Sequence, residues 1–405
     1  MKKKQLRWTL WTIASPFILF IILCILIYLP PIQNFLVDKA AVYASEATGM
    51  NISVGRISLS FPLNLVVTDV DAASPHNDTL LSVRRLQVNV QLLPLLKKQV
   101  EVDGISLQGA TVNSNDLIHG MKLNGTLGEL FISSHGVALD PETAIVNKVL
   151  LKDTDLSLCL NDTAAADTAA SDTTYWKIIL QDIDLQNVSF ALDMPLDSLS
   201  LAASLDNATL RDGLIDLHKS AYSLQTFRIK NGRVRYDSGR PSATASADSL
   251  SAGLDPSHIA LTDIGVKLDS LYYEGRNMKA IISQFVLKER SGVEIVSTEG
   301  RLVSNDKVLR VPSLKLETRD SYLELNAAMD WDALDFKKEG LVSARLMADI
   351  GKPDVVRFMG SMDEKFIRKY PSEPLRIRTG IDGDLNKLKL TTLTAELPGA
   401  LELFA

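Results

Sequence analysis

The sequence predicts a mainly β protein, in which an N-terminal transmembrane helix precedes an elongated antiparallel sheet with few helices. Three observations lead to this fold class. A basic start is followed by a long run without charge, most of the remaining chain of 405 residues alternates apolar with polar side chains, and one short strand phrase recurs. Side chains that alternate with a period of two are typical of half-buried strands.

The N-terminal segment predicts a membrane anchor. Residues 1–7 form a basic cytoplasmic tail, and residues 8–29 carry no charge. A helix of about 22 residues spans about 33 Å, which is enough for the hydrocarbon core of a bilayer. A cleaved signal peptide is the alternative, but its apolar core is shorter and ends in small residues. This run ends in Tyr28-Leu29-Pro30, so we expect an uncleaved single-pass anchor with its N-terminus in the cytoplasm.

The remaining chain divides by period and composition. We expect an amphipathic linker helix over 30–49, an N-terminal β module over 50–160, a low-complexity loop over 161–174 and a repetitive β region over 175–405. Gly49 stands where the linker helix should have its C-cap. A further helix is predicted over Pro353–Tyr370, and the run up to Ala405 lacks a closing element, as expected of a fragment of a longer protein.

The recurring phrase has two alternating apolar residues, a small turn-forming residue, and a resumed strand. Its copies are Ile105–Val112, Ile183–Phe190, Phe227–Val234 and, more loosely, Val266–Tyr273. This spacing indicates a β-bulge or a tight turn between paired strands. The candidate site residues are the first two apolar positions of three copies: Ile105, Leu107, Ile183, Leu185, Phe227 and Ile229.

No pattern in the sequence indicates catalysis or a bound cofactor. The five histidines are scattered without metal-ligand spacing, and no phosphate loop or nucleophile motif is present. Cys24 lies within the apolar run and cannot plausibly bridge to Cys159. A formal net charge of −6 argues against nucleic acid as the main partner. We expect a protein that is not an enzyme and that holds neither a metal nor a cofactor.

The strands present more apolar surface than two helices can cover. That surface must be buried, because large exposed apolar patches are costly and mark interaction sites. A closed sandwich would bury it internally, whereas an open trough would leave a lining that shelters acyl chains. Patterning alone leaves both arrangements open.

The opening third of the chain resembles the AsmA-like family, and within it the TamB-like (translocation and assembly module) proteins. The resemblance is carried, after the anchor and Gly49, by an ordered series of phrases: Asn51–Ile57, Phe61–Leu65, Val67–Val70, Leu80–Val83, Leu86–Val90, Leu93–Leu96 and Val100–Val102 with Ile105 and Leu107. Their order is specific over about the first 110 residues, and only the strand phrases match beyond.

The resemblance implies a curved, groove-like sheet in the periplasm of a Gram-negative bacterium, anchored in the inner membrane. It implies phospholipid transfer between the inner and outer membranes, with the six candidate residues as groove lining. It also implies an alternative, a factor that assembles outer-membrane β-barrel proteins beside a barrel partner. Compared with a full TamB-like protein, we expect the sequence as given to stop before the C-terminal domain that would meet that partner, so the docking role is not expected of this part alone. From the patterning, a third reading is a structural interaction protein built as a β-sandwich.

Overall fold

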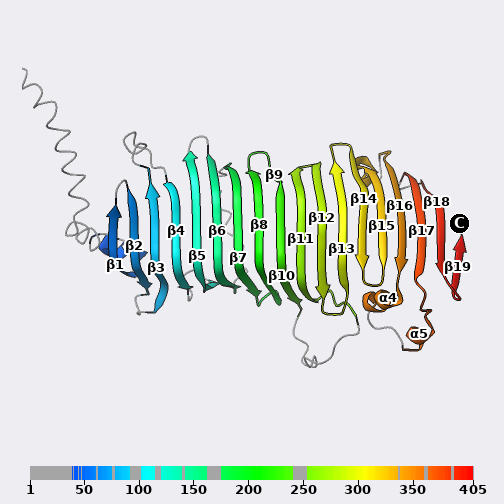
Figure 1. Cartoon of the computed structure of the whole chain (residues 1–405), viewed down its shortest axis with the longest axis horizontal. Coiled ribbons are helices and arrows are strands. Elements are labelled where there is room, and N and C mark those ends of the chain that lie inside the picture. Colours follow the sequence, from blue (N-terminus) through cyan, green and yellow to red (C-terminus); the bar gives the residue numbers. More distant parts are fainter. Residues whose placement is uncertain are drawn as a thin grey trace, which may run out of the picture.

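A computed structural model describes most of the chain beyond the N-terminal segment. The described residues are 39, 41–43, 45–46, 48–60, 63–74, 78–91, 102–114, 120–138, 142–161, 175–239, 253–335, 338–359, 364–384 and 387–404. Within them the chain forms one long, curved sheet of 19 strands (Figure 1).

The strands and short helices follow one another in chain order. They are β1 (Asn51–Ser60), β2 (Asn64–Ala73), β3 (Thr79–Val90), β4 (Val102–Asn113), β5 (Met121–Ala138), β6 (Thr143–Leu160), β7 (Lys177–Met194), β8 (Leu199–Asp216), β9 (Ala221–Leu224), β10 (Thr226–Ser238), β11 (His258–Glu274), β12 (Asn277–Glu289), β13 (Glu294–Ser304), β14 (Val308–Thr318), β15 (Tyr322–Asp330), the 3-10 helix η1 (Trp331–Leu334), β16 (Leu341–Ile350), α4 (Lys352–Met359), α5 (Glu364–Lys369), β17 (Leu375–Asp384), β18 (Lys387–Leu397) and β19 (Leu401–Phe404).

Strand order in the sheet follows chain order, because nearly every strand pairs with the next one along the chain. β9 and β10 share one position, and each pairs with β8 on one side and β11 on the other. Among the described residues, no second sheet lies over either face, and each strand packs against its sheet neighbours. The closed sandwich that the sequence left open is therefore not the arrangement found.

The two long rims of the sheet differ. We call the rim that carries α4 and α5 the helix rim; it also holds the β12–β13 turn and the β14–β15 turn (Figure 1). The opposite rim carries η1. The helix predicted over Pro353–Tyr370 is thus two short helices at a rim.

The structure corrects the predicted fold class in its helical part. The transmembrane helix expected over residues 8–29 lies outside the described residues, as do the tail at 1–7 and positions 162–174 of the expected loop. No helix in the described part of the chain has the length and apolar character needed to cross a membrane. Within the described residues the fold class is therefore a mainly β protein built on one sheet, without a membrane-spanning helix.

The sheet is also not wholly antiparallel, as had been predicted. β6 and β7 pair in parallel, with Thr143 opposite Lys177 and Cys159 opposite Asp193. A parallel pair needs a crossover connection of a dozen or more residues, and residues 161–176 separate these strands. The alternating pattern of each strand fits either direction, which is why the sequence did not reveal the parallel pair.

The predicted C-cap at Gly49 is confirmed. The described residues from 39 to 48 are helical. The amide of Gly49 donates a hydrogen bond to the Ser45 carbonyl at 2.9 Å, and its φ of +70° is left-handed. Glycine has no Cβ to clash in that conformation, so it ends the helix where β1 follows.

A line of left-handed residues crosses the middle of the sheet. At matching levels of β2, β4, β6, β7 and β10, the backbone φ is between 49° and 63° at Asp69, Gly109, Asp153, Asn187 and Asn231. At this level one residue of each strand is left out of the pairing. On β7 and β8, Gln186 pairs with Asn207 and Val188 with Leu205, but Asn187 and Asp206 are not paired. Asp, Asn and Gly tolerate this conformation better than other residues.

This line of left-handed residues explains the recurring phrase. A Cβ placed on Gly232 would lie 3.2 Å from both the Ile229 Cγ2 and the Ile264 Cβ, so positions 229 and 232 share a face. The intervening Lys230 and Asn231 are both exposed. The apolar spacing therefore changes from two to three residues at the left-handed residue and then returns to two. The phrase lies within each strand, so the predicted turn between strands is not found. A register shift of the kind that a bulge makes is present in the copies on β10 and β11, whereas pairing keeps its register across Gly109 and Asn187, so no extra residue is inserted there.

We expect Asn187→Val to destabilise β7 locally by about 1–2 kcal/mol, because a β-branched side chain is strained at positive φ. Asn187→Gly should be nearly neutral: it loses the hydrogen bond from Asn187 Nδ2 to Asp153 Oδ1, 2.9 Å long and exposed, but relieves the backbone. Hydrogen exchange of β7 amides measures both effects. Asn207→Val on β8, where the backbone is not left-handed, is the control, and equal losses at 187 and 207 would contradict the argument.

Candidate functional site

Two rows of apolar side chains run across the strands on one face of the sheet. Residues directly opposite each other in neighbouring strands share a face, so the register defines each row. The first row, from β3 to β12, is Val88, Ile105, Ile132, Val149, Ile183, Leu210, Phe227, Leu268 and Ile282. The second row, two residues along most strands, is Leu86, Leu107, Leu130, Leu151, Leu185, Ala208, Ile229, Val266 and Phe285.

The structure brings all six candidate residues to this one face. Ile105, Ile183 and Phe227 lie in the first row, and their partners two residues on lie in the second. Leu185 and Ile229 flank Ala208, since each of them is directly opposite it. All six side chains are half-buried. The candidates are thus parts of one surface rather than six separate core positions.

Both rows extend beyond β3 and β12 toward the two ends of the sheet. On the N-terminal side they are extended by Leu59 and Leu65, and by Ile57 and Val67. On the C-terminal side the first row passes through Gly300 to Leu314, Leu325, Leu346, Thr379 and Leu393. The second row is broken at β13, where Thr298 lies opposite Leu316, and it continues as Leu316, Leu323, Ala348, Ile377, Ala395 and Leu403. At about 4.8 Å between strands, the rows are about 80 Å long. We call this surface the apolar face.

The opposite face of the same strands is mostly polar. Arg211 of β8 forms ion pairs with Asp184 at 3.0 Å and with Asp182, both on β7. Arg378 of β17 pairs with Asp349 of β16 at 2.8 Å. A hollow of about 310 Å³ on this face is lined by Asn207, Thr209, Arg211, Thr226, Arg228 and Lys230. The sheet is therefore two-sided, with the polar face solvated and the apolar face unmatched by a second layer.

The six candidate residues are only part of the apolar face. Residues of β5, β6 and β8 complete both rows between the named copies of the phrase. Their signal was present as the same change of spacing, for example Leu127, Leu130 and Ile132 on β5. These strands did not match the recurring phrase because the residues around Gly128 on β5 and Asp153 on β6 differ from those in its copies.

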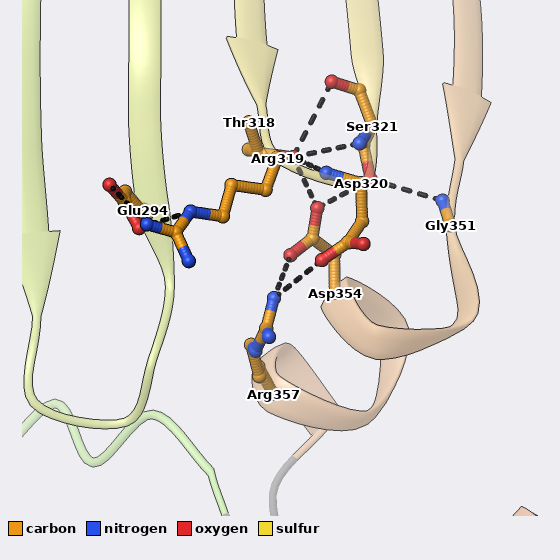
Figure 2. Close-up of polar contacts among 8 residues, drawn as sticks. All are labelled: Glu294, Thr318, Arg319, Asp320, Ser321, Gly351, Asp354 and Arg357. Atoms are coloured by element: carbon orange, nitrogen blue, oxygen red, sulfur yellow. Dashed lines mark hydrogen bonds and ion pairs between the residues drawn. The ribbon is translucent and has the colours of Figure 1, made fainter.

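A buried polar network fixes the start of α4 to the sheet at the helix rim. Asp354 is 1% exposed, and Figure 2 shows its carboxylate directed at the β14–β15 turn. Its Oδ2 accepts hydrogen bonds from Ser321 Oγ, at 2.6 Å, and from Thr318 Oγ1. Its Oδ1 pairs with Arg357 Nη1 at 3.0 Å. Ser321 Oγ in turn accepts the Gly351 amide at 3.0 Å, which ties the end of β16 to the same turn.

Arg357 links this network to a second carboxylate. Its Nη1 lies 2.8 Å from Asp320 Oδ2, and its carbonyl accepts the Leu254 amide at 2.7 Å. Burial opposes the guanidinium charge, but hydrogen bonds to Asp320 and Asp354 outweigh it and raise the pKa of Arg357. Arginine is effectively always protonated in proteins, so Arg357 supplies a fixed positive charge between the two carboxylates.

The described residues contain no group of three or more His, Cys, Asp or Glu side chains arranged to hold a metal ion. His258 is engaged locally, with Nδ1 2.8 Å from Asp255 Oδ2, a hydrogen bond that lowers the pKa of Asp255. Cys159 is half-buried and unbridged. The apolar face, rather than a polar cluster, is the feature on which a function can be based.

Comparison with models of known protein families and with curated proteins gives no match for this chain.

Proposed function

We propose that the apolar face binds the acyl chains of phospholipid, and that the protein carries phospholipid between the inner and outer membranes of a Gram-negative envelope without catalysing a reaction. The observation that supports this proposal is the apolar face, whose rows run from β1 to β18 and β19 with a break in the second row at β13 and have no second layer over them in the described part of the chain. The resemblance of the first 110 residues to AsmA-like proteins points the same way.

The dimensions of the apolar face suit lipid. An acyl chain is about 15 Å long, half the hydrocarbon core of a bilayer, so rows of about 80 Å offer room for several chains. Each methylene transferred from water to an apolar surface contributes about 0.8 kcal/mol. The polar face on the other side of the strands keeps the protein hydrated while lipid is held. A sheet open along one face also gives lipid a continuous path between its two ends.

Photo-crosslinking in cells tests the proposal on the full chain. A benzoylphenylalanine at Leu185 or Ile229 faces the rows, and one at Gln186 or Arg228 sits next to them in the same strands on the polar face. We expect phospholipid adducts several-fold more abundant at the first pair of positions than at the second. Equal labelling of both faces would contradict the proposal.

The same experiment separates the alternatives. Adducts with unfolded outer-membrane β-barrel proteins, in place of lipid, would favour an assembly factor that receives strands. A folded protein without lipid or barrel adducts would favour a structural interaction protein. Either outcome would overturn the lipid proposal.

A further inference from the structure

Helices α4 and α5 place large apolar side chains in solvent at the helix rim. Phe358 is 54% exposed, Met359 64% and Phe366 51%. The side chain of Asp354, on the same helix as two of them, is buried against the sheet. Phe358 and Met359 nevertheless remain exposed to solvent, and both helices lie below the strands in Figure 1.

Basic residues accompany these apolar ones. The segment from Lys352 to Tyr370 has five basic and three acidic residues, in a chain whose formal net charge is −6. Arg368 and Lys369 fall in the last turn of α5, next to Phe366. Asp354, one of the three acids, is neutralised by Arg357. The exposed part of the segment is thus both apolar and cationic.

The segment is held at both ends. The Asp354 network fixes α4 to the β14–β15 turn (Figure 2), and the Lys352 ammonium donates to the Tyr370 carbonyl at 2.8 Å, which joins the start of α4 to the end of α5. Phe366 and Tyr370 also contact through their rings, with centroids 6.0 Å apart. Apolar side chains on such a fixed support lose little further freedom on binding.

We infer that α4 and α5 contact the surface of an anionic lipid bilayer. Helices with exposed aromatic side chains and with Lys or Arg beside them insert their apolar residues at the boundary of headgroups and acyl chains. Anionic headgroups complement the cations, at about 1 kcal/mol for each Lys or Arg near the surface. The contact would place the helix rim, where β14 to β17 end, against a membrane. The role of this contact, the exchange of lipid with the apolar face, rests on the proposed function, whereas the contact itself does not.

An environment-sensitive fluorophore tests the contact on the full chain. Cys24 and Cys159 are replaced by serine, and a single NBD-labelled cysteine is placed at Phe358 or Phe366. Vesicles are phosphatidylcholine alone or mixed with phosphatidylglycerol, with brominated lipid as quencher. Leu334 on the opposite rim is the matched control site, because it is 57% exposed and also apolar.

We expect blue-shifted, quenchable emission at 358 and 366 but not at 334, and only with phosphatidylglycerol. The double substitution Arg368→Gln and Lys369→Gln should lower the affinity for phosphatidylglycerol vesicles about fivefold for each charge removed. Equal quenching at 334 and 358, or no dependence on anionic lipid, would overturn the inference. A blue shift without vesicles that grows on adding unlabelled protein would show self-association and would also overturn it.

This test is separable from that of the proposed function. Quenching at 358 with no lipid adduct at Leu185 would support the membrane contact and contradict the lipid-carrying face. Lipid adducts at Leu185 without quenching at 358 would support the lipid-carrying face and contradict the membrane contact.

Discussion

Replacing Leu185 and Ile229 together by aspartate is expected to lower the phospholipid that purifies with the folded protein at least tenfold. The two positions lie in the second row and flank Ala208, so the two carboxylates interrupt the row at one level. A carboxylate that must lose water to contact an acyl chain costs several kcal/mol, and each 1.4 kcal/mol corresponds to a factor of ten in binding. Because both side chains are only half-buried without lipid, the charges stay hydrated in the free protein and folding should survive.

Mass spectrometry of organic extracts from the full chain, purified in one detergent throughout, measures lipid per protein. The control is Gln186→Asp with Thr209→Asp, which adds two carboxylates to β7 and β8 on the polar face. This control should keep its lipid, and circular dichroism should be the same for all three proteins. Undiminished lipid in a folded Leu185→Asp, Ile229→Asp protein would refute the apolar face as the lipid site.

The second large effect is expected at Asp354. Asp354→Ala removes the acceptor of two hydroxyl groups and one partner of Arg357, and leaves Ser321 and Thr318 facing an apolar group. Unsatisfied buried polar groups cost about 1–3 kcal/mol. Arg357 is 29% exposed and retains Asp320, so the loss of the ion pair adds little. We expect α4 to open more often, with faster hydrogen exchange of its amides and those of the β14–β15 turn.

Two variants separate the contributions. Asp354→Asn keeps an oxygen acceptor for the hydroxyls but loses the charge, so its effect should be smaller than that of alanine. The control is Asp332→Ala, which breaks an exposed ion pair with Lys338 on the opposite rim. Because a surface ion pair contributes about 0–1 kcal/mol to stability, the exchange of nearby amides should change little. Exchange in α4 that is unaltered in Asp354→Ala would show that the network does not hold the helix.

The candidate site could be predicted in its parts but not in its extent. The alternation of Ile183 with Leu185 places both on one face of one strand, whatever surrounds that strand. The alignment of Leu185 with Leu107 and Ile229 depends on the register of every intervening strand, and their sequence separations are long. The buried role of Asp354 likewise depends on the β14–β15 turn, more than thirty residues earlier in the chain.

The sequence by itself determined the strand content, the apolar face of each strand, the change of apolar spacing in the recurring phrase and the end of the linker helix at Gly49. These features are local, because side-chain period and glycine φ depend on neighbouring residues. Only the tertiary structure decided that the strands form one sheet rather than a sandwich, that β6 and β7 run parallel, and that apolar residues of distant strands line up in rows. Those choices are made by pairing between distant strands, where an alternating pattern satisfies several partners and directions equally well.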